Sequence, residues 1–227
     1  MFTAFTLDQD AAKKADQEGG RINRTDKYVG VIKRFEFVIA KTGTKGVEIF
    51  FESDSKEEAS MTLYTEKSDG TPIFGRDKVM ALMACTSTRT LTPVDTQAEK
   101  YDRDVGAKIL QPVTVAPELE NKRVGFLIQM EEYLNGNGEV KTKPQLISSF
   151  QADTGLMAKE ILERKTTPEQ LDKAYARLIK QGDKKLQGQP QQQSGGYGNT
   201  SKQISAGGAI SDLDDDLPFA PVHYALG

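Results

Sequence analysis

Apolar and polar residues alternate along three successive stretches in the first third of the chain, residues 28–40, 47–52 and 60–65. A period of two places successive side chains on opposite faces of a strand, so each stretch predicts a β-strand. The predicted buried faces carry Val29, Val31, Phe35, Phe37 and Ile39 in the first strand, Val47, Ile49 and Phe51 in the second, and Met61 and Leu63 in the third.

The period changes after the turn signal Ser68-Asp-Gly70. Val79, Leu82 and Met83 recur at helical spacing, which predicts a short helix over residues 75–84. Residues 86–122 contain three prolines and many Thr, Asp and Glu residues. We interpret this segment as a long irregular excursion with small strands near Ile109 and Val113.

Two further strands are predicted over residues 124–133 and 140–150. The sequence Asn135-Gly-Asn-Gly138 between them is typical of a hairpin turn. Pro144 interrupts the second of these strands. Because proline cannot donate to a hydrogen-bond ladder, it predicts an edge strand or a bulge there.

Two helices are predicted to follow the last strand. The first spans about residues 155–165. The second begins with Thr167 as its cap, Pro168 at the first helical position and Gln170 completing a capping box. Beyond Gly182 the chain is dominated by Gln, Gly and Ser, which predicts a flexible linker.

The predicted order is therefore three strands, a helix and two strands, which is the chain order of an OB-fold. Other small β-barrels have a similar order of elements. We predict a mainly β protein with an OB-fold-like five-stranded barrel, a helix between its third and fourth strands, and added C-terminal helices. The predicted divisions are a lead-in (1–20), the barrel (21–152), the helices (153–181), the linker (182–210) and a disordered acidic tail (211–227).

Charge and composition narrow the functional classes. The chain carries 30 basic and 33 acidic residues, and a nearly neutral body does not by itself indicate nucleic acid. Cys85 and His223 are its only cysteine and histidine, so an intrachain disulfide and a Cys/His zinc site are excluded. No phosphate-binding G-x-x-x-x-G-K-[ST] loop is present. We expect no cofactor, no metal and no enzymatic activity.

No apolar run resembles a signal peptide or reaches the length of a membrane span, so we expect a soluble, cytoplasmic protein with no membrane partner.

The segment near the end reads D-L-D-D-D-L-P-F. It combines carboxylates with apolar side chains, so it offers a hydrophobic anchor inside a negative field to a basic, apolar pocket on a partner. The predicted partner-binding residues are Asp212, Leu213, Asp214, Asp215, Asp216, Leu217, Pro218 and Phe219. A tail that only improves solubility is the alternative.

This segment resembles the acidic tail of bacterial single-stranded DNA-binding proteins, which ends in a run of Asp, an aliphatic residue, Pro and Phe. The resemblance implies that the tail recruits replication, recombination and repair proteins. In the bacterial tails Phe is the last residue, whereas this chain continues through residues 220–227. The role of the tail therefore carries over more readily than its mode of binding.

The predicted strand order, the linker and the tail together resemble phage-type single-stranded DNA-binding proteins with an OB-fold. The resemblance implies a protein that coats single-stranded DNA in the host cytoplasm. Its oligomeric state stays open, with a homo-oligomer among the options.

An OB-fold commonly binds single strands across its second and third strands. The alternation predicts that Phe50 and Tyr64 point outward there and form a platform on which bases stack. Burial of both aromatics under helix or tail residues is the alternative. The predicted phosphate contacts are Lys33, Arg34, Lys41, Lys45, Lys141 and Lys143, with Arg21, Arg24 and Lys27 extending the path. Ordinary solvated charge is the alternative for each of them.

Two other functions remain open. One is an adaptor that binds proteins through its tail and uses the barrel as a scaffold, which the nearly neutral body favours. The other is a strand-annealing recombination factor without a nucleotide site.

Overall fold

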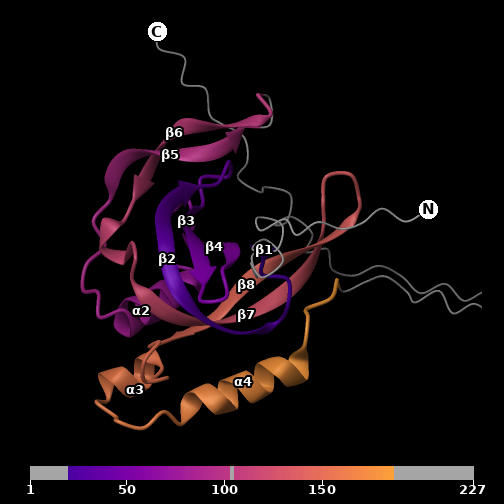
Figure 1. Ribbon diagram of the computed structural model, residues 1–227. Helices are drawn as coiled ribbons and strands as arrows, with labels where there is room; N and C mark the ends of the chain where they lie inside the picture. Colours follow the sequence, from indigo (N-terminus) through magenta and orange to yellow (C-terminus); the bar gives the residue numbers. More distant parts are fainter. Residues whose placement is uncertain (1–19, 103–104, 187–227) are drawn as a thin grey trace, which may run out of the picture.

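The computed structural model describes residues 20–102 and 105–186 (Figure 1). This part of the chain is mainly β, with few helices and a sheet that curls into a half-barrel. Within the described residues, no helix is both long and apolar enough to cross a bilayer.

The strands are β1 (Gly20–Arg21), β2 (Asp26–Ile39), β3 (Lys45–Ser53), β4 (Glu57–Glu66), β5 (Val94–Asp102), β6 (Ala107–Val115), β7 (Arg123–Leu134) and β8 (Val140–Phe150). The helices are α2 (Gly75–Cys85), the 3₁₀ turn η1 (Pro117–Leu119), α3 (Ala158–Leu162) and α4 (Gln170–Gln181).

The sheet runs in the order β1-β4-β3-β2-β6-β5, and β7 and β8 branch from β2. The first half of β2 pairs with β7, and most of its length pairs with β3. Strand β8 pairs with β7 alone among the described strands, so Pro144 lies in an edge strand as predicted.

A β-bulge divides β2 into two halves. Ile32 lies opposite Phe51 and Arg34 lies opposite Phe50, so Lys33 is one extra residue. Because side chains alternate along a strand, one extra residue exchanges the two faces. The predicted buried face of β2 is therefore wrong in its first half, where Ile32 points into the core instead of Val29 and Val31, and Ile39 at the far end is 69% exposed.

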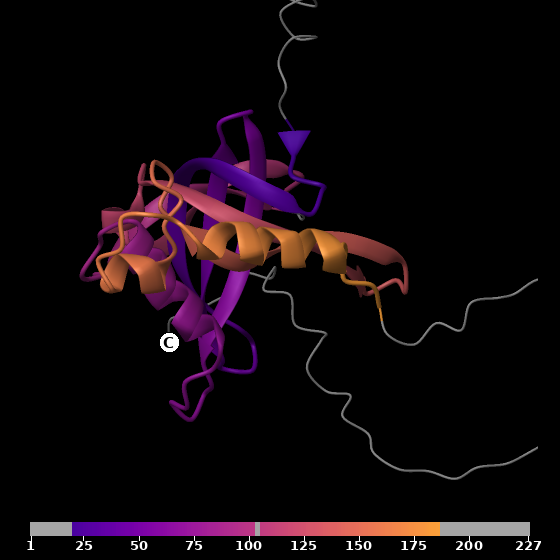
Figure 2. The same cartoon turned by 90° about the horizontal axis from the view of Figure 1, so that it is seen from below.

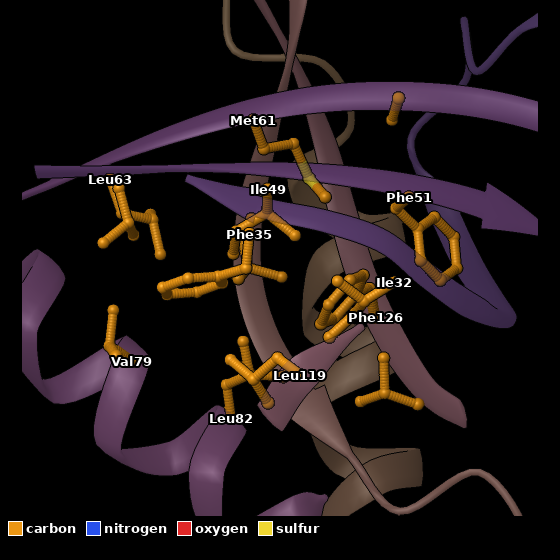
Figure 3. Packing of buried hydrophobic residues seen from close by; sticks show 14 of the residues in the cluster. Ile32, Phe35, Ile49, Phe51, Met61, Leu63, Val79, Leu82, Leu119 and Phe126 are labelled. Carbon is orange, nitrogen blue, oxygen red and sulfur yellow. The ribbon is translucent and has the colours of Figure 1, made fainter. Parts of the chain in front are cut away.

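The main hydrophobic core lies between the curled sheet, α2 and η1 (Figure 3). The predicted buried faces of β3 and β4 are confirmed, since all five of their apolar residues are buried. The Phe51 and Phe126 rings approach to 4.8 Å between centroids. Helix α2 has the predicted bounds to within a residue and contributes Val79 and Leu82. Each large apolar side chain buried here stabilises the fold by about 1.5–3 kcal/mol.

The segment 86–122 is not irregular throughout. Strands β5 and β6 pair along their whole length as a hairpin, and β6 joins β2 through Glu36 opposite Val115. The small strands predicted near Ile109 and Val113 are thus both parts of β6. Strand β5 was not predicted because it is largely exposed and contains few apolar residues.

A second hydrophobic cluster lies where α4 packs across β2 and β7. It is built from Leu127, Phe150, Leu171 and Leu178, with Val29 among the residues packed against it. Figure 2 shows α4 running lengthwise in front of the strands. The bulge explains this cluster, because it turns Val29 away from the main core and toward α4.

The predicted start of the second C-terminal helix is wrong. Helix α4 begins at Gln170, and its N-cap Glu169 makes no side-chain cap hydrogen bond. Instead, the fully buried Glu160 carboxylate of α3 accepts hydrogen bonds from the backbone N–H groups of Glu169 (2.7 Å) and Gln170 (2.9 Å). A carboxylate from a neighbouring helix therefore replaces the predicted capping box.

Candidate nucleic-acid interface

The sheet β2-β3-β4 has a second face on the side away from the main core, which we call the outer face. Its residues follow from the strand register. Arg34, Phe50 and Ser60 form one row across the three strands. The next rows are Glu36, Glu48 and Thr62, and then Val38, Gly46 and Tyr64.

Phe50 and Tyr64 both lie on the outer face, as the alternation predicted, and both are half-buried. They are not neighbours, however. Phe50 is opposite Ser60, four residues before Tyr64, so the two positions are about 13 Å apart along the strands. The two aromatics of the predicted platform are therefore separate positions, with the Glu36–Glu48–Thr62 row between them.

Each aromatic ring has a fixed neighbour. The Arg34 guanidinium lies 3.9 Å from the centroid of the Phe50 ring, close enough for cation–π attraction. Tyr64 lies over Gly46, where an added Cβ would be 3.1 Å from Cδ1 of Tyr64 and 2.6 Å from the carbonyl oxygen of Leu63. A side chain at position 46 would therefore push against β4, and glycine lets the tyrosine lie close to the sheet.

Two buried carboxylates occupy the row between the aromatics. The carboxylate of Glu36 accepts from Arg34 (2.5 Å) and forms an ion pair with Lys100 of β5 (2.6 Å). Glu48 accepts a hydrogen bond from Ser60. Burial raises the pKa of Glu48, and the negative charge of Glu36 adds to the effect, while the Ser60 hydroxyl opposes it.

The Lys100–Glu36 pair ties the β5–β6 hairpin to the outer face. In Figure 1 this hairpin lies above β3 and β4, and the β7–β8 hairpin extends to one side of them. A pocket of about 390 Å³ between the hairpin and β2 has both Glu36 and Lys100 in its lining. The sequence did not reveal this contact, because polar residues at outward positions look like solvated charges.

Most of the predicted phosphate-binding lysines have carboxylate neighbours. The pairs are Lys33–Glu52 (3.8 Å), Lys45–Glu66 (2.7 Å), Lys141–Glu139 (3.1 Å) and Lys143–Glu131 (3.8 Å). Lys41 is exposed in the β2–β3 turn and has no ion pair within the described part of the chain. Exposed pairs of this kind contribute about 0–1 kcal/mol each, so a phosphate can displace the carboxylate at small cost.

Several residues considered from the sequence lie away from this face or outside the described residues. Arg24 and Lys27 lie beside α4, where the Lys27 ammonium is 5.1 Å from the Tyr175 ring centroid. The predicted tail residues Asp212–Phe219 and His223 lie outside the described residues.

The described residues offer little for covalent or metal chemistry. Burial raises the pKa of the Cys85 thiol to about 12, so it stays protonated near neutral pH and is a poor nucleophile. No group of three or more His, Cys, Asp or Glu side chains in the described ranges is arranged to hold a metal ion.

A scan of protein-family models and a search of curated proteins both found no match to this chain.

Proposed function

We propose that this chain is a non-catalytic single-stranded DNA-binding protein whose outer face holds the strand. The strand order β4-β3-β2-β7-β8, with α2 between β4 and β7 in the chain, supports an OB-fold, whose five strands follow this order. On this assignment β1 and the β5–β6 hairpin are additions to the barrel.

The observation that carries the proposal is the position of Phe50 and Tyr64 on β3 and β4. These strands correspond to the second and third strands of an OB-fold, which commonly bind single strands. Every base has a π-face, so partly exposed aromatic rings on this surface bind a strand with little sequence preference. The separation of about 13 Å along the strands suits two bases that are not adjacent in the strand.

Phosphate groups would lie along the edges of this face. Lys41 and Lys45 belong to the turn between β2 and β3, and Lys141 and Lys143 belong to the hairpin between β7 and β8. Binding exchanges the Glu66, Glu139 and Glu131 partners of three of these lysines for phosphates. Affinity should therefore fall with salt. The acidic tail would recruit replication, recombination and repair proteins, as its resemblance to bacterial tails implies.

The test is fluorescence anisotropy with labelled oligo(dT) and a matched duplex across a salt series. We expect salt-sensitive binding to the single strand and weak binding to the duplex. Phe50→Ala and Tyr64→Ala should each weaken single-strand binding by about 1–3 kcal/mol. Tyr101→Ala is the matched control, because Tyr101 is 63% exposed on β5 and neighbours Lys100 in the chain, so it points away from the outer face.

The ion pairs of the predicted lysines favour a second function, an adaptor that binds proteins through its tail. In an adaptor those pairs would serve only to keep the surface soluble. If the wild-type protein binds neither oligonucleotide at low salt, the DNA-binding proposal fails and the adaptor function remains.

A further inference from the structure

We infer that the outward side of α4 is a second contact surface for the same DNA strand and binds its phosphates. The inference rests on the proposed function and extends it to a helix outside the barrel. The surface consists of Lys173, Arg177 and Lys180, which we call the α4 ridge.

The helical register places the three cations of the α4 ridge in one line. They occur at i, i+4 and i+7, so they share the side of α4 opposite its buried residues Leu171 and Leu178. All three are exposed, and they span about 10.5 Å along the helix axis. Figure 2 shows this helix on the outside of the described part of the chain.

The charges of the α4 ridge are not neutralised by neighbours. In the described part of the chain none of the three has an ion pair, in contrast to Lys33, Lys45, Lys141 and Lys143. The nearby carboxylates have other partners, since Asp26 accepts from the Tyr175 hydroxyl (2.7 Å) and Asp183 accepts from Thr25 (2.5 Å). Two exposed carboxylates lie near Lys173, namely Asp172 beside it in the chain and Glu169 one turn earlier, and Glu169 pairs with Lys165 (3.8 Å).

Two further cations lie beside α4, where the helix packs near the start of β2. Lys27 stands over the Tyr175 ring, and Arg24 lines a pocket of about 390 Å³ together with Ile179 of α4. Neither has an ion pair within the residues described. These two cations add positive charge where α4 packs near the start of β2.

Helix α4 lies beyond one end of the outer face, with its buried side on β2 and the α4 ridge on the side that points away from the sheet. Helix α4 packs over Val29, and the bulge at Lys33 brings Val29 and Arg34 to the same side of β2. A strand that passes Tyr64 and then Phe50 is thus directed toward α4. Phosphate groups are bound through their charge and do not need an apolar groove. A line of cations on an exposed helix can therefore bind the backbone of the strand.

The test measures the salt dependence of binding to a long and a short oligo(dT), of about 30 and about 8 nucleotides, chosen around typical site sizes of OB-folds. The variant is K173A/R177A/K180A. The matched control is R76A/R89A/K122A, which removes the same charge from exposed positions on α2, the segment after it and the turn before β7. Circular dichroism of both variants checks that they fold.

We expect the ridge variant to reduce the slope of log K against log salt for the long oligonucleotide by about 2, at about 0.7 for each phosphate contact. Its binding to the short oligonucleotide and the binding of the control variant should stay close to wild type. Equal slopes for the ridge variant and wild type would overturn the inference while leaving the proposed function intact. Absence of single-strand binding by the wild-type protein would instead remove the proposed function itself.

A second measurement needs no variant. Acetylation of lysines by a soluble ester, read by mass spectrometry, should be suppressed at Lys173 and Lys180 by the long oligonucleotide and not by the short one. A synthetic peptide of residues 211–219 is the competing acidic ligand. If the ridge variant loses binding to this peptide and keeps its full DNA slope, the surface is a peptide site and the inference is wrong.

Discussion

Two fully or nearly buried glutamates, Glu48 on the outer face and Glu160 at the junction of α3 and α4, have opposite pKa shifts. Burial raises the pKa of both. At Glu160 the backbone N–H groups of Met157, Glu169 and Gln170 outweigh burial and hold the pKa below its usual value. At Glu48 burial raises the pKa, the single Ser60 hydroxyl does not offset it, and the charge of Glu36 raises it further.

The difference separates a region built for stability from one that is not. The α3–α4 junction gives its carboxylate three backbone N–H donors. The outer face keeps two carboxylates in adjacent strands and supplies cations to only one of them at close range. The comparison therefore distinguishes a junction that stabilises its buried charge from an outer face that leaves one buried carboxylate without a cation at close range.

The largest effect on stability should come from Glu160→Ala. This change removes the acceptor of three backbone hydrogen bonds, and we expect a loss of about 3 kcal/mol in the free energy of unfolding, measured with urea. Glu163→Ala is the matched control at the C-cap of the same helix, since Glu163 is exposed and should change stability by less than about 0.5 kcal/mol. Equal losses in the two variants would contradict the assigned role of Glu160.

The stabilisation by Glu160 should also depend on pH. Because its pKa is lowered on folding, its contribution is complete above the unfolded-state pKa of about 4.3 and is lost as pH falls through the folded-state pKa. The stability difference between wild type and Glu160→Gln should therefore shrink on acidification. A difference that is constant from pH 7 to pH 3 would show that the charge is not what holds the junction.

An intermediate effect is expected for Lys100→Ala on the outer face. Glu36 keeps Arg34 but loses its ion pair with the hairpin, which we expect to cost about 2 kcal/mol. Amide hydrogen exchange should increase mainly in β5 and β6. Lys108→Ala, an exposed position on the same hairpin, serves as the control. Unchanged exchange in the hairpin would mean that the backbone pairing of β6 to β2 is sufficient to fix it.

The smallest effect, and one of opposite sign, is expected for Glu48→Gln. Because folding raises the pKa of Glu48, its ionisation opposes folding, and this cost appears as pH rises from the unfolded-state value through the folded-state value. The variant should equal or slightly exceed wild type in stability at pH 7 and lose any advantage near pH 4. A clear destabilisation at pH 7 would show that the Glu48–Ser60 hydrogen bond outweighs the cost of burial.

The sequence predicted those parts of the fold in which alternation is unbroken. In β3 and β4 every second residue is apolar, so Ile49, Met61 and their neighbours were assigned to the core correctly. The prediction failed in β2, because a single extra residue at Lys33 leaves no mark on composition. It also failed at the start of α4, because the capping carboxylate of Glu160 comes from a different helix.

The candidate site was predictable to the same degree. The alternation of side chains placed Phe50 and Tyr64 on the outer face. The distance between them depends on how β3 and β4 pair, and the sequence of one strand alone does not specify that register. The Lys100–Glu36 contact joins residues 64 positions apart and needs the β5–β6 hairpin to fold back over the sheet. Ion pairing of the lysines likewise depends on which carboxylates the fold brings within reach.

The bulge at Lys33 lets one strand serve two layers of the protein. Before it, Ile32 faces the main core and Val29 faces α4; after it, Phe35 faces the core and Arg34 faces outward. In a regular strand of the same sequence, without the bulge, Val29 and Phe35 are six residues apart and would lie on one face. Either the main core or the cluster under α4 would then lose its apolar residues.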